Sequence, residues 1–194
     1  MTTPQRRSTG GPRQAAAIFA ATLELLADKG YDGLTMESVA ARSGVNKTTL
    51  YRWWPAKDAL LAAALTDSDL LSFPMPDTGS LRGDLLALAH AIAELLTAES
   101  TAPIATAVLA AAPARPQLAQ VGATFFAERL GREQPVFERA VARGELDASC
   151  DPAAIMDLLG GAIWFRLLLR GQPLTPEYLA RAVDLVVDGL PGAS

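Results

Sequence analysis

Cysteine and histidine are nearly absent from the 194-residue sequence, which contains one of each, Cys150 and His90. A single cysteine cannot form an internal disulfide, and it agrees with a reducing, cytoplasmic compartment. Structural zinc sites need clusters of these two residue types, so no metal site is expected. Cys150 could sense oxidants, and His90 could bind an effector or sense pH, but a bystander thiol and an ordinary helix histidine are the commoner cases.

Signatures of enzymes are also missing. The sequence has no phosphate-binding Walker loop, no dinucleotide fingerprint and no nucleophile elbow. The pair Gly160-Gly161 follows no strand and opens no phosphate loop, and we interpret carboxylates such as Glu128 and Glu133 as solvated helix charges. We therefore predict that the chain is not an enzyme and uses no cofactor.

Long apolar segments are lacking too. Residues 100–114 carry no charge, but Pro103 and Pro113 interrupt them, and they are too short to span a bilayer. No basic segment followed by an apolar one opens the sequence, so no export signal is expected. Half of the residues are hydrophobic, which is enough to bury a core in one or two domains. We predict a cytoplasmic protein without a membrane partner.

Charge is unevenly distributed along the chain. The formal net charge is -4, yet residues 1–60 hold eight Lys or Arg against five acids, and the remainder holds nine against sixteen. Electrostatic attraction acts over a Debye length, about 8 Å in physiological salt, so a local basic surface can bind an anionic partner despite the total. Residues 1–13 could form a basic arm on DNA or a solvated tail, and the sequence leaves both open.

Residues 35–57 carry the strongest local pattern. Thr35 can cap a helix that runs to about Ser43, Gly44 can adopt a left-handed conformation, and Asn46 can cap a second helix. The residue before Pro55 is pushed out of the helical region, so the second helix ends after about two turns. This order predicts a helix-turn-helix whose second helix enters a DNA major groove.

The second helix of this unit has two different faces. Leu50 and Trp54 are four residues apart and should point inward with Val39, Ala40 and Val45. The opposite face then offers donors suited to phosphate oxygens and base edges, namely Lys47, Thr48, Tyr51 and Arg52.

The first third of the chain resembles the N-terminal domain of TetR-family (TetR/AcrR-type) transcriptional regulators. The spaced residues that carry the resemblance are Gly30-Tyr31, Leu34-Thr35, Val39-Ala40, Ser43-Gly44-Val45, Thr49-Leu50-Tyr51, Trp54 and Lys57. The resemblance implies a homodimer that binds a double-stranded DNA operator and is regulated by a small-molecule effector, here unknown. It also implies DNA contacts at Thr35, Lys47, Thr48, Thr49, Tyr51, Trp53 and Lys57.

The rest of the chain reads as helices separated by proline and glycine. We expect helices over residues 14–29, 55–71, 81–98, 104–112, 117–143 with a kink or break at Pro135, 152–170 and 175–189. The predicted fold is all-α, with nine or ten helices and no sheet. The predicted organisation is a basic arm (1–13), a helix-turn-helix domain (14–58) and a helical effector-binding and dimerisation domain (59–194).

Helix 152–170 is apolar on all sides, so one side should be covered by a second subunit, together with the last helix. The predicted interface residues are Ile155, Leu158, Leu159, Ala162, Leu179, Val183 and Val186. An apolar effector pocket between helices is also predicted, although a place in the plain core is the commoner case for each single residue. The candidate pocket residues are His90, Leu109, Phe125, Phe126, Met156 and Trp164.

Two functions are consistent with these patterns and with what the resemblance implies. The first is a ligand-responsive repressor that binds a palindromic operator as a dimer. The alternative is a helical dimeric interaction protein whose DNA-binding unit no longer functions. The first function is favoured by the polar side chains of Lys47, Thr48, Tyr51 and Lys57, because a helix that no longer binds DNA would not need them.

Overall fold

The computed structural model describes residues 14–111 and 116–190, and within these ranges it contains nine α-helices and no strand. The predicted all-α class is confirmed. The elements are α1 (Ala15–Gly33), α2 (Met36–Ser43), α3 (Lys47–Trp53), α4 (Lys57–Asp67), the 3-10 turn η1 (Asp69–Leu71), α5 (Leu81–Thr97), α6 (Ala102–Ala111), α7 (Pro116–Ala142), α8 (Pro152–Trp164), the π-helical turn η3 (Phe165–Leu169) and α9 (Pro176–Asp188).

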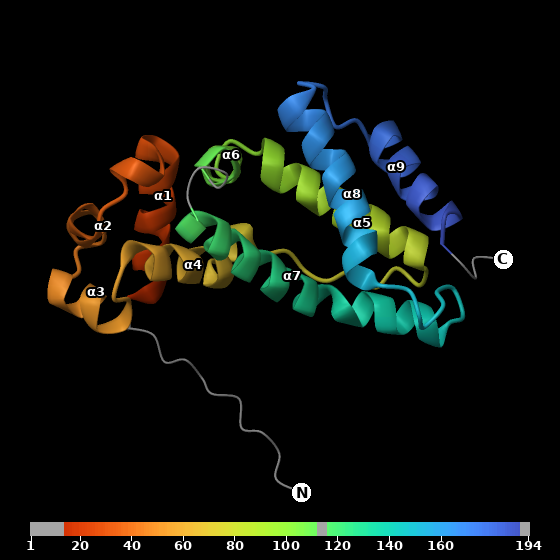
Figure 1. The fold of residues 1–194 in the computed structure, drawn as a ribbon, viewed down its shortest axis with the longest axis horizontal. Coiled ribbons are helices and arrows are strands. Elements are labelled where there is room, and N and C mark those ends of the chain that lie inside the picture. Colours follow the sequence, from red (N-terminus) through yellow and green to blue (C-terminus); the bar gives the residue numbers. More distant parts are fainter. Residues whose placement is uncertain (1–13, 112–115, 191–194) are drawn as a thin grey trace, which may run out of the picture.

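The helices form an elongated molecule with two ends (Figure 1). The N-terminal helices α1–α3 lie at one end, and α5, α8 and α9 lie at the other. Helices α4 and α7 pack against each other and run between the two ends. The α8 end and the α3 end are therefore connected through α7 and α4.

Two apolar cores hold this arrangement together. The first joins α1–α4 to α6 and the start of α7 through buried side chains such as Leu26, Leu61, Ile104 and Leu118. The second joins α5, the end of α7, α8 and α9. Because the first core continues into α6 and α7, helices α1–α4 do not pack as a separate unit. The predicted boundary at residue 58 stays a prediction, and the proposed arm 1–13 lies outside the described residues.

Two glycines lie where a helix is interrupted or ends, at the positions that the sequence predicts. Gly30 has a φ of 65° and interrupts α1, and Gly44 has a φ of 70° and closes α2. Both angles fall in the left-handed region, which favours glycine because it has no Cβ. A side chain at Gly44 would strain the turn between α2 and α3.

Several predicted helix bounds were wrong. Helix α4 begins at Lys57 and not at Pro55, because Ala56 is extended (φ -146°, ψ 163°). It ends at Asp67, where Ser68 is extended and its side chain accepts a hydrogen bond from Leu70 N. Helix α7 continues through Pro135 as one helix, so of the predicted kink or break the break is absent, and the kink stays a prediction. The buried neighbours Val136 and Phe137 hold that segment against the core, which offsets the one backbone hydrogen bond that proline removes.

Candidate DNA-binding surface and internal cavity

Side-chain caps fix the corner between α2 and α3. Thr35 Oγ1 accepts a hydrogen bond from Ser38 N at 3.1 Å, and Asn46 Oδ1 accepts one from Thr48 N at 2.8 Å. Each bond satisfies a backbone donor that a helix start leaves free. Thr35 is exposed but already serves as a cap, so any contact of its hydroxyl with DNA is shared with this role.

The orientation of α3 follows from its apolar side. Leu50 is fully buried, and Trp54 is buried with its ring edge-on to Phe19 at a centroid distance of 5.6 Å. This anchoring turns the opposite side outward. The exposed α3 side chains are Lys47, Thr48, Tyr51, Arg52 and Trp53, while Thr49 is half-buried. The predicted reading face is thus brought to the surface as one set, with Tyr51 and Trp53 each 43% exposed.

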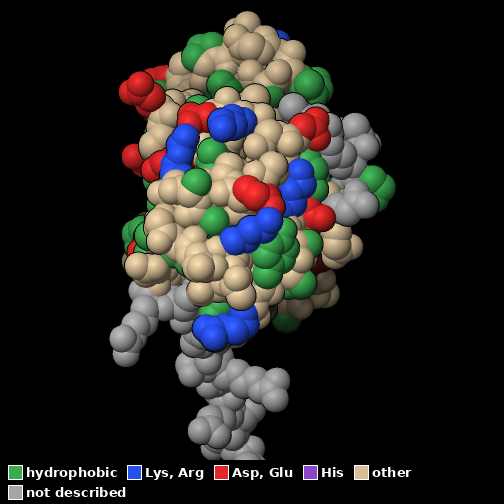
Figure 2. Space-filling model, turned by 90° about the vertical axis from the view of Figure 1, so that its left-hand side faces the viewer, with side chains coloured by type: hydrophobic (Ala, Val, Ile, Leu, Met, Phe, Trp, Pro, Cys, Tyr) green, Lys and Arg blue, Asp and Glu red, His purple; other side chains and the backbone are tan. Residues whose placement is uncertain are grey.

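Charge on this end of the molecule is mixed (Figure 2). Lys47 forms an ion pair with Glu37, which lowers the pKa of that carboxyl through a hydrogen bond. Arg42 pairs with Glu24 and Asp28 at 3.4 and 3.2 Å. These pairs are exposed and therefore weak, so a phosphate can displace Glu37 from Lys47.

Lys57 has a structural role in addition to its predicted phosphate contact. Its Nζ donates to the backbone oxygen of Tyr31 at 2.9 Å and lies 4.0 Å from the centroid of the Tyr31 ring. Lys57 is the first residue of α4, so this contact fixes the start of α4 to the end of α1. Substitution of Lys57 would disturb this junction as well as any DNA contact.

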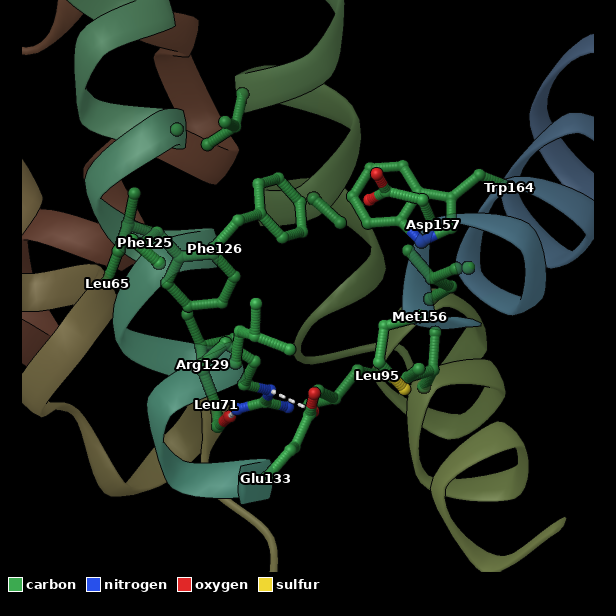
Figure 3. Close-up of a pocket in the computed structure, with 18 of the residues that line it drawn as sticks. Leu65, Leu71, Leu95, Phe125, Phe126, Arg129, Glu133, Met156, Asp157 and Trp164 are labelled. Atoms are coloured by element: carbon green, nitrogen blue, oxygen red, sulfur yellow. Dashed lines mark hydrogen bonds and ion pairs between the residues drawn. The ribbon is translucent and has the colours of Figure 1, made fainter. Parts of the chain in front are cut away.

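An internal cavity of about 640 Å³ lies between α5, α7 and α8 (Figure 3). Leu65 of α4 and Leu71 of η1 also line it, so the helix that leads to α3 forms part of the wall. The lining is mostly apolar with a few charged groups. Small-molecule sites have this size and composition.

Aromatic rings line one side of the cavity. Phe126 lies edge-on to Phe125 at a centroid distance of 5.3 Å and to Trp164 at 5.6 Å. Phe125 and Phe126 come from α7 and Trp164 from α8, so the rings span the gap between these two helices (Figure 3). Edge-on rings of this kind leave flat faces for an apolar guest.

A buried ion pair lies in the same cavity. Arg129 Nε is 3.7 Å from Glu133 Oε1, and their side chains are 12% and 3% exposed. Glu133 Oε1 has no hydrogen-bond partner. Burial raises the pKa of Glu133 to about 7, and the nearby Arg129 opposes this only in part. Burial destabilises the charged form of a carboxylate, which explains why the pKa of Glu133 is raised.

Arg129 also connects the cavity to the segment after α4. Its Nη1 donates to the backbone oxygen of Leu71 at 2.8 Å, and its guanidinium lies 3.9 Å from the centroid of the Phe73 ring. Burial lowers the pKa of Arg129. One turn along α7, Arg132 Nη2 donates to the backbone oxygen of Thr66 at 2.8 Å. The cavity wall and the end of α4 are therefore joined by directed hydrogen bonds.

The structure brings four of the six predicted pocket residues together, because Phe125, Phe126, Met156 and Trp164 all line the cavity. His90 does not: it is exposed on α5 and is absent from the lining, so its placement in the pocket was wrong. Buried side chains such as Leu85, Leu88 and Ala89 occupy the inner face of α5. The side chain of Leu109 lies outside the part that the structure describes.

Sequence reasoning missed the charged pair of the cavity. Glu133 was interpreted as a solvated charge, which is wrong, since the residue is 2% exposed. A signal was available in the spacing of α7. Phe125, Arg129 and Glu133 are each four residues apart and continue the stripe of Leu118 and Val136. Residues at this spacing share one helix face, so both charges fall within an apolar stripe.

Comparisons with known proteins agree with this architecture. Residues 18–64 match the family model of bacterial regulatory proteins of the tetR family, and residues 75–186 match that of the tetracyclin repressor-like C-terminal domain. The HTH-type transcriptional regulator YdeS of Bacillus subtilis is 32% identical over 187 residues, which cover 94% of this chain and 92% of the relative.

Two further relatives cover nearly the whole chain. The DNA-binding transcriptional repressor TetR of Mycobacteroides abscessus is 34% identical over 193 residues, which cover 94% of this chain and 97% of that protein. The crystal structure of the TetR-family transcription regulator SCO0332 superimposes with a TM-score of 0.74 at 33% identity, over 93% of this chain and 100% of that chain. The chain belongs to the TetR family. It is a helix-turn-helix transcriptional regulator, and its relatives are regulators rather than enzymes.

The α8–α9 side of this TetR-family chain differs from the predicted dimer surface. The structure buries four of the predicted interface residues in the core of the single chain: Ile155, Leu159, Leu179 and Val183. Their assignment to a dimer contact was wrong, because side chains without exposed area cannot touch a second subunit. Leu158 is 64% exposed, and Ala162 and Val186 are half-buried.

Much of α8 is apolar and uncovered in the single chain. Pro152–Leu169 is long and apolar enough to cross a membrane by length and composition, and 17% of it is buried. This composition is weak evidence for a membrane span, because core helices of soluble proteins share it. Exposed apolar side chains on this segment include Phe165 and Leu169. A surface of this kind marks a site of contact with another molecule.

Proposed function

We propose that the chain is a cytoplasmic, ligand-responsive repressor that binds a near-palindromic operator as a homodimer. The observation that carries the proposal is α3, whose apolar side is anchored by Leu50 and Trp54 while Lys47, Tyr51 and Arg52 face outward. Two such helices in successive major grooves contact half-sites about 34–36 Å apart, or at a longer spacing set by the bundle. The repressor of Mycobacteroides abscessus, 34% identical, supports repression.

The exposed side of α8 supports the dimer. A stripe of small and apolar residues that are all exposed runs along α8 and into η3 at helical spacing: Ala154, Leu158, Gly161, Phe165 and Leu168. Residues separated by four and three positions share one face. The same surface on a second copy is complementary to this stripe in a two-fold contact. We propose this α8 stripe, with Leu185 of α9, as the dimer contact.

The cavity supports regulation by a small molecule. Leu65 of α4 and Leu71 of η1 line it, and Arg129 and Arg132 donate hydrogen bonds to the backbone oxygens of Leu71 and Thr66. The other end of α4, which follows α3 in the chain, is fixed to the end of α1 through Lys57. A ligand that binds better to the conformation with the wrong spacing of the two α3 helices shifts the population away from DNA.

Selection of bound fragments from random double-stranded DNA tests the proposal. We expect an enriched inverted repeat whose half-site spacing fits two copies of α3. The absence of any enriched sequence would support the alternative, a helical interaction protein with a non-functional DNA-binding unit. The selected fragment then serves as the operator in all further measurements.

Tyr51→Ala should weaken binding to the selected operator by about tenfold or more, because a half-site loses a base or phosphate contact in both copies. Fluorescence anisotropy of the labelled fragment measures this. Leu70→Ala is the matched control, since Leu70 is similarly exposed but lies in η1 beyond α4. Equal affinities of the Tyr51→Ala variant and the control would remove Tyr51 from the reading face.

A further inference from the structure

The polar groups of the cavity restrict the chemistry of its ligand. Glu133 is almost fully buried, faces the cavity and has an oxygen, Oε1, without a hydrogen-bond partner (Figure 3). Buried polar atoms in folded proteins are nearly always hydrogen-bonded, and an orphan acceptor is costly. A guest with a hydrogen-bond donor removes this cost.

We propose that the effector is a neutral, ring-containing apolar molecule that donates one hydrogen bond, from a hydroxyl or a ring N–H, to Oε1 of Glu133. This rests on the proposed function of the cavity as the effector site. The rings of Phe125, Phe126 and Trp164 supply the apolar contact, and the cavity of about 640 Å³ holds a molecule of two to three fused rings.

A cationic ligand fits this site less well than a neutral one. The guanidinium of Arg129 already lies 3.7 Å from the free oxygen of Glu133. A second positive charge at that oxygen would stand next to Arg129 in a setting of low dielectric, where repulsion between like charges is strong. The donor that meets Glu133 is therefore uncharged.

An anionic ligand fits less well for a related reason. A carboxylate would have to bind Arg129, but Nη1 of that residue is used by the backbone oxygen of Leu71 and its face by the Phe73 ring. Glu133 and Asp157 also line the cavity and would repel a second anion. The remaining lining is apolar, so a carboxylate would find no other cation there besides Arg129, which already faces Glu133.

Four matched probes test the proposal: 2-naphthol with a donor, 2-methoxynaphthalene without one, 2-naphthylmethylamine as the cation and 2-naphthoate as the anion. Isothermal titration calorimetry at pH 8 with the full-length protein gives each dissociation constant. We expect 2-naphthol to bind at least about tenfold more tightly than 2-methoxynaphthalene, because the ether leaves the acceptor unpaired. The cation and the anion should bind more weakly than 2-naphthol.

Substitution of the acceptor separates the hydrogen bond from apolar contact. In Glu133→Leu the preference for 2-naphthol over 2-methoxynaphthalene should fall to about twofold or less. Glu133→Met provides a second replacement if the first does not fold, as judged by circular dichroism. Glu128→Gln is the control, because Glu128 is exposed on the same helix; it should keep the full preference.

Every other outcome overturns the inference. Equal binding of 2-naphthol and 2-methoxynaphthalene, tightest binding of either charged probe, a preference that survives in both Glu133 variants, or no binding of any probe each excludes a neutral donor ligand at Glu133. The proposed function is tested separately on the selected operator. Tight binding of 2-naphthol without release of that DNA would sustain the ligand class and count against ligand-responsive repression.

Discussion

Leu158→Glu should convert the dimer into a monomer and weaken operator binding by at least about a hundredfold. Leu158 is 64% exposed in the single chain and belongs to the α8 stripe. In a two-fold contact the substitution removes two buried leucines and introduces two carboxylates near each other. Loss of about 2 kcal/mol per leucine, together with the cost of burying charge, should therefore separate the two subunits.

The effect on DNA binding follows from the loss of a linked half-site. Two recognition helices on one dimer bind with an affinity that exceeds that of a single helix by about 10²–10⁴. A monomer loses this gain although its α3 is unchanged. Sedimentation velocity measures the oligomeric state, and anisotropy with the selected operator measures the affinity. The two losses should appear together.

The control for this experiment is Val141→Glu. Val141 is also an exposed apolar residue, at 37%, but it lies near the end of α7 and outside the α8 stripe. The Val141→Glu variant should sediment and bind DNA as the unaltered protein does. An unchanged dimer in Leu158→Glu would exclude the α8 stripe as the contact. Ile155 and Leu159 are unsuitable for this test, because a charge in the buried core would unfold the chain.

Local chemistry made the helix-turn-helix predictable. Thr35, Gly44 and Asn46 act within a few residues of their own positions, and each does in the structure what its residue type favours. The start of α4 was harder to predict, since proline is tolerated in the first turn of a helix but does not require a helix to begin there. The extended conformation of Ala56 depends on how α4 meets α1, where Lys57 binds the Tyr31 carbonyl.

Tertiary packing decided the rest of the site. The sequence shows that α8 is apolar on all sides, but its pattern is the same whichever side faces the core. Ile155 and Leu159 face inward because α5 and α9 lie there, and Leu158 is left outside. The pocket aromatics were predictable because Phe125, Phe126 and Trp164 have few other places in a helical bundle. Arg129 and Glu133 were missed because residue type was weighed above their spacing on α7.

Replacement of Glu133 by glutamine should change how stability depends on pH. Burial raises the pKa of Glu133 to about 7 in the folded chain, against an ordinary value of 4.5. The folded chain therefore binds this proton more tightly than the unfolded chain. Its contribution to stability is complete below about pH 4.5 and is lost as the pH rises to about 7. The difference between the two pKa values corresponds to about 3 kcal/mol.

Glutamine removes this titration while keeping the shape of the side chain. The free energy of unfolding of Glu133→Gln should equal that of the unaltered protein near pH 4.5. At pH 8 the variant should be more stable by about 3 kcal/mol, which corresponds to about 6–12 °C in melting temperature. The ion pair with Arg129 exists only while Glu133 is ionised, and the pKa of about 7 already includes its opposing effect. Urea unfolding of both proteins at pH 5, 6, 7 and 8, at one protomer concentration, measures the difference.

The control for the pH experiment is Glu128→Gln, which replaces an exposed carboxylate five residues earlier on α7. Its stability should run parallel to that of the unaltered protein over the whole range. Parallel curves for Glu133→Gln as well would mean that the carboxyl is solvated, and would remove the orphan acceptor on which the ligand class depends.

A ligand that donates to Oε1 stabilises the ionised form of Glu133. Saturation with such a ligand should therefore flatten the fall in stability of the unaltered protein between pH 5 and 8. The pH dependence of the stability of the glutamine variant should not change.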